Sequence, residues 1–300
     1  MKILDFGSLN LDHFYSVYHI VEPGETQDTL AIETLSGGKG LNQAVAIAKA
    51  GLKVQLAGCI GEDGAMLRDV CRQYGVDDSL LKTVDGLTGN TVIQLDKNGQ
   101  NSILLYGGAN RAVDRAYVDE VLAHYGEGDY LVLQNEISEL PYIIDEAYAR
   151  GMKIVLNPSP FDDRLKACDM QKVAVFMVNE VEGAQLSGSE NPDRVLDAME
   201  ERYPDAHIVL TLGKRGSVYR YHGMTVPQSA FPVEAVDTTG AGDTFTGYFL
   251  AGFTAIEGEV TEEAIKKVME RASLASSITC TRKGAAPAIP TAAEVDAVTR

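Results

Sequence analysis

The chain alternates short apolar runs with segments that carry an apolar residue at every third or fourth position. The runs have the length of buried strands, and the periodic segments have the length of surface helices. Strands joined by helices pack as right-handed crossovers, so the pattern predicts an α/β fold: a doubly wound, mostly parallel sheet with helices on both faces. The expected strands are 3–7, 53–60, 130–134, 153–157, 173–178, 207–212, 217–221 and 231–235. The expected helices are one that starts after Gly40 and ends at Gly51, followed by 63–74, 113–124, 138–150, 162–168, 180–187, 191–202, 241–253, 261–280 and 291–299.

Two segments depart from this alternation. Residues 13–35 show no helical period and contain a Pro23-Gly24 turn, and residues 91–106 read as a hairpin around Asn98-Gly99. We therefore expect segments 10–36 and 88–107 to form β-structure beside the main sheet, as a candidate lid. The whole chain, 1–300, is expected to be one domain that carries this lid.

A loop of small residues, Gly240-Ala241-Gly242, leads directly into an apolar helix with three phenylalanines spaced four apart. Glycines allow a sharp turn, and the first N–H groups of a helix have no partner within it. Together with the helix dipole they favour a phosphate or a developing oxyanion. Asp243 lies in the first turn, where it fits a base that accepts a hydroxyl proton. The alternative is a tight turn with a first-turn capping acid.

Polar residues follow successive strands, where open α/β sheets bind their ligands. Neutral amides and carboxylates there suit a polyol, and the Thr211–Gly216 loop suits a nucleotide phosphate or ribose. Each residue alone has another explanation, because Asn and Asp often end strands or cap helices. The residues are Asn10, Asp12, Asn135, Glu136, Asn157, Asn179, Glu182, Thr211 and Gly213.

Composition and missing motifs exclude several classes of protein. The formal net charge is −17, from 26 basic and 43 acidic residues without a basic run, which argues against a nucleic-acid or anionic-membrane partner. No GxxxxGK[ST], early GxGxxG or GxSxG motif occurs, and the five histidines are scattered. The four cysteines are widely spaced, and the start lacks a signal peptide. We therefore expect a cytoplasmic protein with reduced thiols.

Several motifs resemble those of the ribokinase-like (PfkB) sugar kinases. Gly37–Ala44 is similar to their N-terminal signature and Asp237–Phe245 to their C-terminal signature. Asn179–Glu182 matches their Asn-x-x-Glu motif, Thr211–Gly216 matches their nucleotide loop, and Thr281–Ala285 resembles the ribokinase branch. The resemblance covers essentially the whole chain in order.

This resemblance implies ATP-dependent phosphorylation of a sugar hydroxyl. Asp243 would take the proton, and the N–H groups of Gly240, Ala241 and Gly242 would hold the charge of the transferring phosphoryl group. Asn179 and Glu182 would help to hold Mg²⁺, largely through water. The residues implied for ATP are Asn179, Thr211, Gly213, Gly216 and Gly242.

The residues implied for the sugar match the ribose-binding set of the family, which favours D-ribose and ribose 5-phosphate as acceptor and product. They are Asn10, Asp12, Gly38, Lys39, Asn42 and Glu136, together with Asp243. The lid segments themselves are not diagnostic. The alternatives are a sibling kinase for another sugar, sugar acid or nucleoside, and a non-catalytic sugar- or nucleotide-binding protein.

The resemblance also implies a bound K⁺ near the anion hole and a homodimer through the lid. Asp237, Thr239 and Gly284 would contribute to the K⁺ site. Ala288 stands where a serine commonly adds a ligand oxygen, so we expect a weakened dependence on K⁺.

Overall fold

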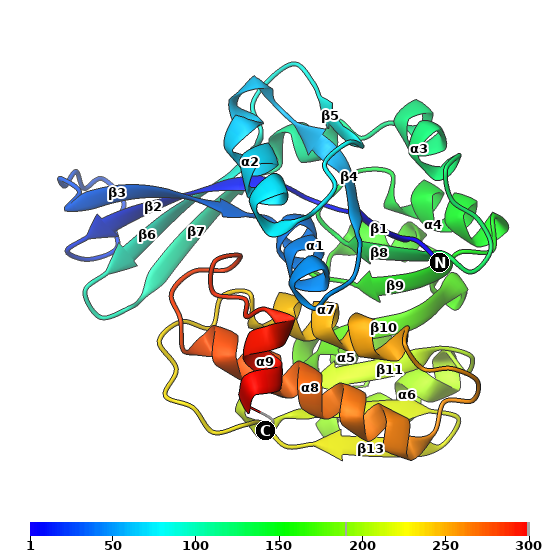
Figure 1. Cartoon of the computed structure of the whole chain (residues 1–300). Coiled ribbons are helices and arrows are strands. Elements are labelled where there is room, and N and C mark those ends of the chain that lie inside the picture. Colours follow the sequence, from blue (N-terminus) through cyan, green and yellow to red (C-terminus); the bar gives the residue numbers. More distant parts are fainter. Residues whose placement is uncertain (190, 299–300) are drawn as a thin grey trace.

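The computed structural model describes residues 1–189 and 191–298, which form a large sheet and a separate small sheet (Figure 1). The large sheet has the strand order β13-β12-β11-β10-β9-β8-β1-β4-β5. Its strands are parallel from β5 to β11, and β12 and β13 are antiparallel at one edge. The predicted doubly wound fold is therefore confirmed. The strands are β1 (Ile3–Phe6), β4 (Gln55–Ile60), β5 (Leu81–Thr83), β8 (Tyr130–Gln134), β9 (Lys153–Asn157), β10 (Val173–Asn179), β11 (His207–Thr211), β12 (Ser217–Tyr221) and β13 (Met224–Gln228).

Helices cover both faces of the large sheet because its strands are apolar on both sides. In β1, Ile3 packs into the core beneath α1, α7 and α8, whereas Leu4 and Phe6 pack into the core beneath α3, α4, α5 and α6. The helices are α1 (Lys39–Lys49), α2 (Ala65–Tyr74), α3 (Arg115–Leu122), α4 (Leu140–Ala149), α5 (Glu180–Ser187), α6 (Val195–Arg202), α7 (Ala241–Phe253), α8 (Glu262–Cys280) and α9 (Ala292–Val298).

The prediction of a strand at 231–235 is wrong. The partner of β12 is β13, which follows a two-residue turn in which His222 and Gly223 both have positive φ. Such a turn matches the twist of two antiparallel strands, so the hairpin closes at once. Pro232 within the predicted segment cannot donate to a ladder.

Three smaller differences concern short elements. The predicted helix 162–168 is a 3₁₀ turn, Asp163–Ala167, which begins where the Asp162 side chain accepts the Arg164 N–H. The three-residue strand β5 was not predicted, because so short a run carries no clear period. The last predicted helix, 291–299, is α9 as far as the structure describes it, and Thr299 lies outside the described residues.

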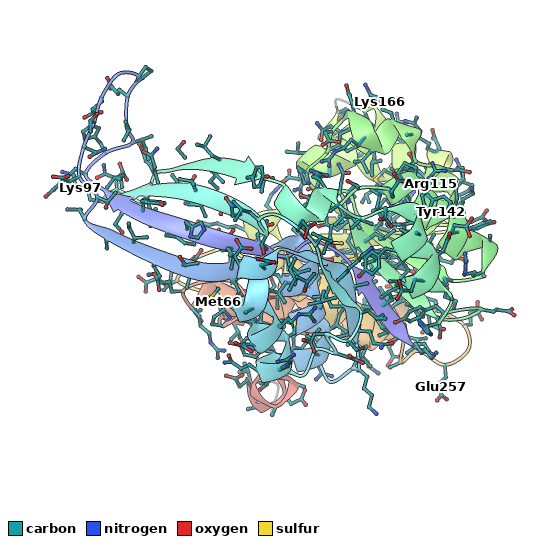
Figure 2. All side chains as sticks on the ribbon, turned by 90° about the horizontal axis from the view of Figure 1, so that it is seen from above. Met66, Lys97, Arg115, Tyr142, Lys166 and Glu257 are labelled. Atoms are coloured by element: carbon teal, nitrogen blue, oxygen red, sulfur yellow. The ribbon has the colours of Figure 1, made fainter. Side chains whose placement is uncertain are left out.

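The small sheet consists of β2 (Asn10–Val17), β3 (Ala31–Gly37), β6 (Gly89–Asp96) and β7 (Asn101–Tyr106), in the order β3-β2-β6-β7. It comes from the two segments that break the helical pattern. It projects from the large sheet, with Lys97 at its tip, on the far side of the molecule from Arg115 and Tyr142 (Figure 2). The β6–β7 loop is closed by Gly99 at φ 78°, with the Asp96 carboxylate accepting the N–H groups of Asn98 and Gln100.

Close packing fixes the position of α1. A Cβ on Gly40 would come within 2.5 Å of the Gly7 backbone, so α1 begins directly against the end of β1. A Cβ on Gly247 of α7 would come within 2.5–2.7 Å of Ala46 and Ile47 of α1. The two helices therefore pack backbone to backbone, and their N-termini lie side by side at the carboxyl ends of the strands.

Candidate active site

The N-terminus of α7 has the geometry of an anion site built from the backbone. Gly240 precedes the helix at φ 74° with its Cα facing Ala285, a conformation that favours glycine. A Cβ on Gly242 would meet nothing within 4 Å, so this residue faces open space. Across the described residues, the N–H groups of Gly240, Gly242 and Asp243 donate to no protein acceptor, while the Ala241 N–H reaches Thr238 O at 3.3 Å. The free N–H groups at the helix start suit a phosphoryl group.

The Asp243 carboxylate is buried beside this anion site and is oriented by α1. Its Oδ2 accepts a hydrogen bond from Asn42 Nδ2 at 3.3 Å, and its Oδ1 accepts one from Gln43 Nε2 at 2.9 Å. Two neighbouring residues of α1 thus hold the two oxygens of one carboxylate of α7. This contact requires the close approach of the two helices at Gly247.

A cavity of about 220 Å³ opens in front of α7 and joins most of the residues expected for the nucleotide and the reaction. Asn179 and Glu182 reach it from the start of α5, where they form a capping box: Asn179 Oδ1 accepts the Glu182 N–H, and Glu182 Oε2 accepts the Asn179 N–H. The predicted residues that line it are Lys39, Asn157, Asn179, Glu182, Thr211, Gly240, Gly242 and Asp243.

Two other predicted nucleotide residues shape the loop after β11 and do not line this cavity. Gly213 has φ 56° and Gly216 has φ 100°, both in the region that favours glycine. A Cβ on Gly216 would collide with the Gln228 carbonyl, so the loop can lie against β13 only with glycine there. Arg215 of this loop forms an ion pair with Glu180 at the start of α5.

Lys39 supplies the positive charge of the cavity. Burial alone would lower its pKa, but the carboxylates of Asp243, Glu136 and Glu182 outweigh burial and raise the pKa above its ordinary value. Lys39 is therefore a cation near neutral pH and can balance the charge of a phosphate group. We expected it to contact the sugar, and the structure places it in the same cavity as the nucleotide-loop residue Thr211.

The predicted sugar residues lie around the start of α1 and the base of the small sheet. Asn10 is buried, and its Oδ1 accepts a hydrogen bond from Asn110 Nδ2 at 2.8 Å. Glu136 Oε2 accepts the Lys39 N–H at 3.1 Å and is also bonded by the Ser8 hydroxyl. Gly38 has φ 92°, and a Cβ there would meet the Ser8 carbonyl at 2.7 Å.

Asp12 belongs to β2 of the small sheet. Its Oδ1 accepts the Thr91 hydroxyl at 2.6 Å, and only a glycine at position 37 leaves room for its Oδ2. Burial raises its pKa, the Thr91 bond opposes the rise, and the charge of Glu136 adds to it. Asp12 lines a second cavity of about 710 Å³ between the small sheet and the tail that follows α8.

The second cavity also contains the three residues expected to contribute to a K⁺ site. Asp237 ties the loop before α7 to the tail: Oδ1 accepts the Thr239 N–H at 2.9 Å, and Oδ2 accepts the Gly284 N–H at 2.9 Å. Although burial works against it, these hydrogen bonds lower the pKa of Asp237. Thr238 lines both cavities, so the two are adjacent.

The donors fit a water-coordinated Mg²⁺ and a weakly held K⁺. Both carboxylate oxygens of Glu182 accept hydrogen bonds from Asn179. They keep lone pairs for water, but they are not free to bind a metal ion together. No group of three acidic, His or Cys side chains within the described chain is arranged to grip a metal. The lowered pKa of Asp237 favours a carboxylate that suits a monovalent ion, and the buried methyl group of Ala288 adds no ligand oxygen.

Sequence reasoning missed several residues of the site. Gln43 lies within the Gly37–Ala44 signature, which implies no role for it, although it bonds to Asp243. Ser8 received none either, and its hydroxyl bridges Glu136 and the Gly40 N–H. Ser159 lines the first cavity after β9. Polar residues at the ends of apolar runs were the available signal, but their partners lie far away in the sequence.

None of the helices in the described part of the chain has the length and apolar character needed to cross a membrane. The family model for the pfkB family carbohydrate kinases matches residues 2–292. A ribokinase of Haemophilus influenzae is 34% identical, with 96% of this chain and 95% of that protein covered.

Two solved structures are similar over their whole length. The ribokinase of Cryptococcus neoformans in complex with ADP has a TM-score of 0.85 and 31% identity, covering 99% of both chains. The Arabidopsis thaliana ribokinase complexed with ribose and ATP has a TM-score of 0.84 and 28% identity, covering 100% of this chain and 98% of the other. The chain therefore belongs to the pfkB family of carbohydrate kinases.

Proposed function

We propose that the protein is a ribokinase, which transfers the γ-phosphoryl group of ATP to the 5-hydroxyl of D-ribose and releases ribose 5-phosphate and ADP. The observation that carries the proposal is the position of Asp243: a buried carboxylate beside a helix N-terminus with free N–H groups, in a cavity that also holds Lys39. Similarity to ribokinases over nearly the full chain supports ribose as the acceptor.

In this mechanism Asp243 accepts the proton of the attacking hydroxyl, with Asn42 and Gln43 holding its two oxygens. The free N–H groups of Gly240 and Gly242, with Lys39, balance the charge on the transferring phosphoryl group. Ala241 contributes less to this anion hole, because its N–H is already directed at Thr238 O.

The nucleotide is assigned to the first cavity, against Asn179, Thr211 and the loop of Gly213 and Gly216. Mg²⁺ would be held through water by Asn179 and Glu182, where it neutralises phosphate charge. K⁺ would lie beside Asp237, Thr239 and Gly284, and would support the loop that leads into α7. ATP as cosubstrate and four free cysteines support a cytoplasmic place of action.

The sugar is assigned to Asn10, Asp12, Gly38, Asn42 and Glu136, and the small sheet is proposed to close over it as a lid on a single catalytic domain. Asp12 supports this arrangement, because it belongs to the small sheet and faces the second cavity. Closure would remove water from the sugar hydroxyls, so every unpaired polar group there becomes costly.

The acceptor panel tests the function directly. With ATP, Mg²⁺ and K⁺, we expect ADP release to depend on D-ribose, with ribose preferred over other pentoses, deoxyribose, hexoses, sugar acids and nucleosides. The measurement is coupled ADP release at equal acceptor concentration. A tenfold preference for another acceptor would keep the kinase but remove ribose, and ATP consumption that no acceptor stimulates would indicate a non-catalytic binding protein.

Asp243→Asn tests the base. We expect kcat to fall about 10²–10⁴-fold, because the amide keeps the shape but cannot take a proton. ATP binding, measured by calorimetry, should be unchanged. Asp119→Asn on α3 makes the same chemical change far from both cavities and should retain full turnover. Turnover of Asp243→Asn within tenfold of wild type would mean that the proton leaves by another route.

Asp12→Ala tests the sugar assignment. Loss of a charged acceptor from a closed site should raise the KM for ribose about 10- to 100-fold, while the KM for ATP stays the same. Asp28→Ala, an exposed residue of the same lid segment, serves as the matched control and should change neither constant. An unchanged KM for ribose in Asp12→Ala would exclude Asp12 as a sugar ligand.

The small sheet is also proposed to join two copies of the chain. Ile32, Leu104 and Tyr106 each expose more than half of their side chains on it, and such an apolar surface is typical of an interface. We expect sedimentation at micromolar concentration to show a dimer. A species of 32.3 kDa alone would contradict it.

A further inference from the structure

Asp5 is a charged residue in the middle of β1, where the rest of the strand is apolar. Its side chain is fully buried and faces the layer between the large sheet and helices α1 and α7. Oδ1 accepts a hydrogen bond from Gln134 Nε2 at 3.1 Å, and Oδ2 has no hydrogen-bond partner. Asp5 lines neither cavity, so it has no direct role toward a substrate.

A line of amides connects Asp5 with Asp243. Gln134 Nε2 also donates to Gln43 Oε1 at 2.9 Å, and Gln43 Nε2 donates to Asp243 Oδ1 at 2.9 Å. The line runs through the core from β1 and β8 to α1 and α7. Gly7 makes room for it: a Cβ there would collide with Gln134 Oε1 and come within 2.8 Å of Asp5 Oδ1.

The line has a direction because each amide has a donor end and an acceptor end. Gln134 uses its two N–H donors on Asp5 and Gln43, and the Gln43 oxygen is thereby turned toward Gln134. The Gln43 N–H₂ group must then face Asp243 Oδ1 and Asn157 Oδ1. In the flipped orientation, the Gln43 oxygen would oppose these two acceptors.

The other end of the line is fixed independently. Asn157 Nδ2 donates to the Met177 backbone carbonyl at 2.9 Å, so its Oδ1 faces Gln43. Asp5 on one side, and Asn157 and Asp243 on the other, are thus the acceptors that determine how the two amides between them are oriented. Of these, Asn157 and Asp243 border the cavity, whereas Asp5 is remote from it.

Asp5 can hold this place only as a neutral acid. A fully buried carboxylate with one oxygen lacking any donor would be far from stable. Burial raises its pKa well above the ordinary value, the Gln134 hydrogen bond opposes the rise, and the negative charge of Asp243 on α7 adds to it. Two side chains, those of Gln134 and Gln43, lie between Asp5 and Asp243, and both are uncharged.

We propose that Asp5 is a positioning residue for the phosphoryl-transfer step, which orients Gln134 and Gln43 so that Gln43 holds the Asp243 carboxylate toward the acceptor hydroxyl. The proposal rests on the proposed role of Asp243 as the base. It assigns a catalytic consequence to a side chain that touches neither sugar nor nucleotide. It also explains why a strand interior contains an acidic residue.

Two variants of equal shape test it. Asp5→Leu removes the hydrogen-bond acceptor for Gln134. We expect kcat to fall about tenfold, because the orientation of the base is lost. The KM values for the sugar and for ATP should stay within twofold of wild type. Asp5→Asn keeps the acceptor oxygen and places a donor where Oδ2 has no partner, so its kcat should stay within twofold of wild type.

A control separates positioning from loss of structure. Ile3→Ala removes buried volume from the same face of β1, and should lower the free energy of unfolding without changing kcat. Wild-type kcat in Asp5→Leu would overturn the proposal. An equal loss of kcat in Asp5→Asn and Asp5→Leu, or in Ile3→Ala, would overturn it as well.

The neutral state of Asp5 can be checked without any turnover. The pKa of Asp5 is raised in the folded protein. The stabilisation from its protonated form is therefore complete below the pKa of Asp5 in the unfolded chain, near 4, and is lost as the pH rises toward the pKa of Asp5 in the folded protein. In urea titrations above pH 4, the unfolding equilibrium constant of wild type relative to Asp5→Asn should rise with pH, by up to about tenfold per pH unit, until the folded pKa is reached. A ratio that does not change with pH would mean an ionised Asp5 and would overturn the proposal.

The two proposals fail in different ways. If wild type prefers another acceptor, the kcat comparison is made with that acceptor, and the role of Asp5 is tested unchanged. If Asp243→Asn retains turnover, the base is wrong and the kcat effect expected for Asp5→Leu disappears with it. The pH dependence of stability does not rely on activity, and reports on Asp5 in either case.

Discussion

The close packing of α1 against α7 is the constraint on which the site depends. Gly247 lets the two helices meet at their backbones, and Gly40 lets α1 begin against the end of β1. Both helices run in the same direction, as the contacts of Gln43 with Asp243 and of Tyr248 with Lys49 show. Their positive ends therefore point to the same place. A larger residue at either glycine would separate Asp243 from Asn42 and Gln43, which hold its carboxylate.

Burial and neighbouring charges together determine which side chains in this region are charged. Lys39 stays charged because three carboxylates surround it, while Asp5, without a cation or a full set of donors, favours its neutral form. Asp243 lies between these two and is held by amide donors alone. Such an arrangement places one carboxylate next to the free N–H groups at the start of α7.

The small sheet contributes Asp12 to the proposed sugar side of the site. Asp12 reaches the second cavity from β2 and is fixed by Thr91 of β6, so its position follows the sheet as a body. One ion pair, Lys283 with Glu33, connects the small sheet to the tail after α8, and both side chains are exposed. Exposed pairs are weak, so this contact adds little to the attachment of the small sheet to the tail.

The sequence by itself determined the order of strands and helices, the loop of Gly240 to Gly242, and the residue types around it. These follow from local period and turn chemistry, which act over a few residues. It placed a strand at 231–235 wrongly because the true partner of β12 is chosen by a two-residue turn at His222 and Gly223.

Only the tertiary structure decided which distant residues meet. Gln43 and Asp243 are 200 positions apart, and Asp5 and Gln134 are 129 apart. Hydrogen bonds between such residues leave no periodic trace, because each partner reads locally as an ordinary polar residue. Whether Asp5 is charged depends on the surroundings that burial and Asp243 create, and these exist only after the sheet and helices have packed.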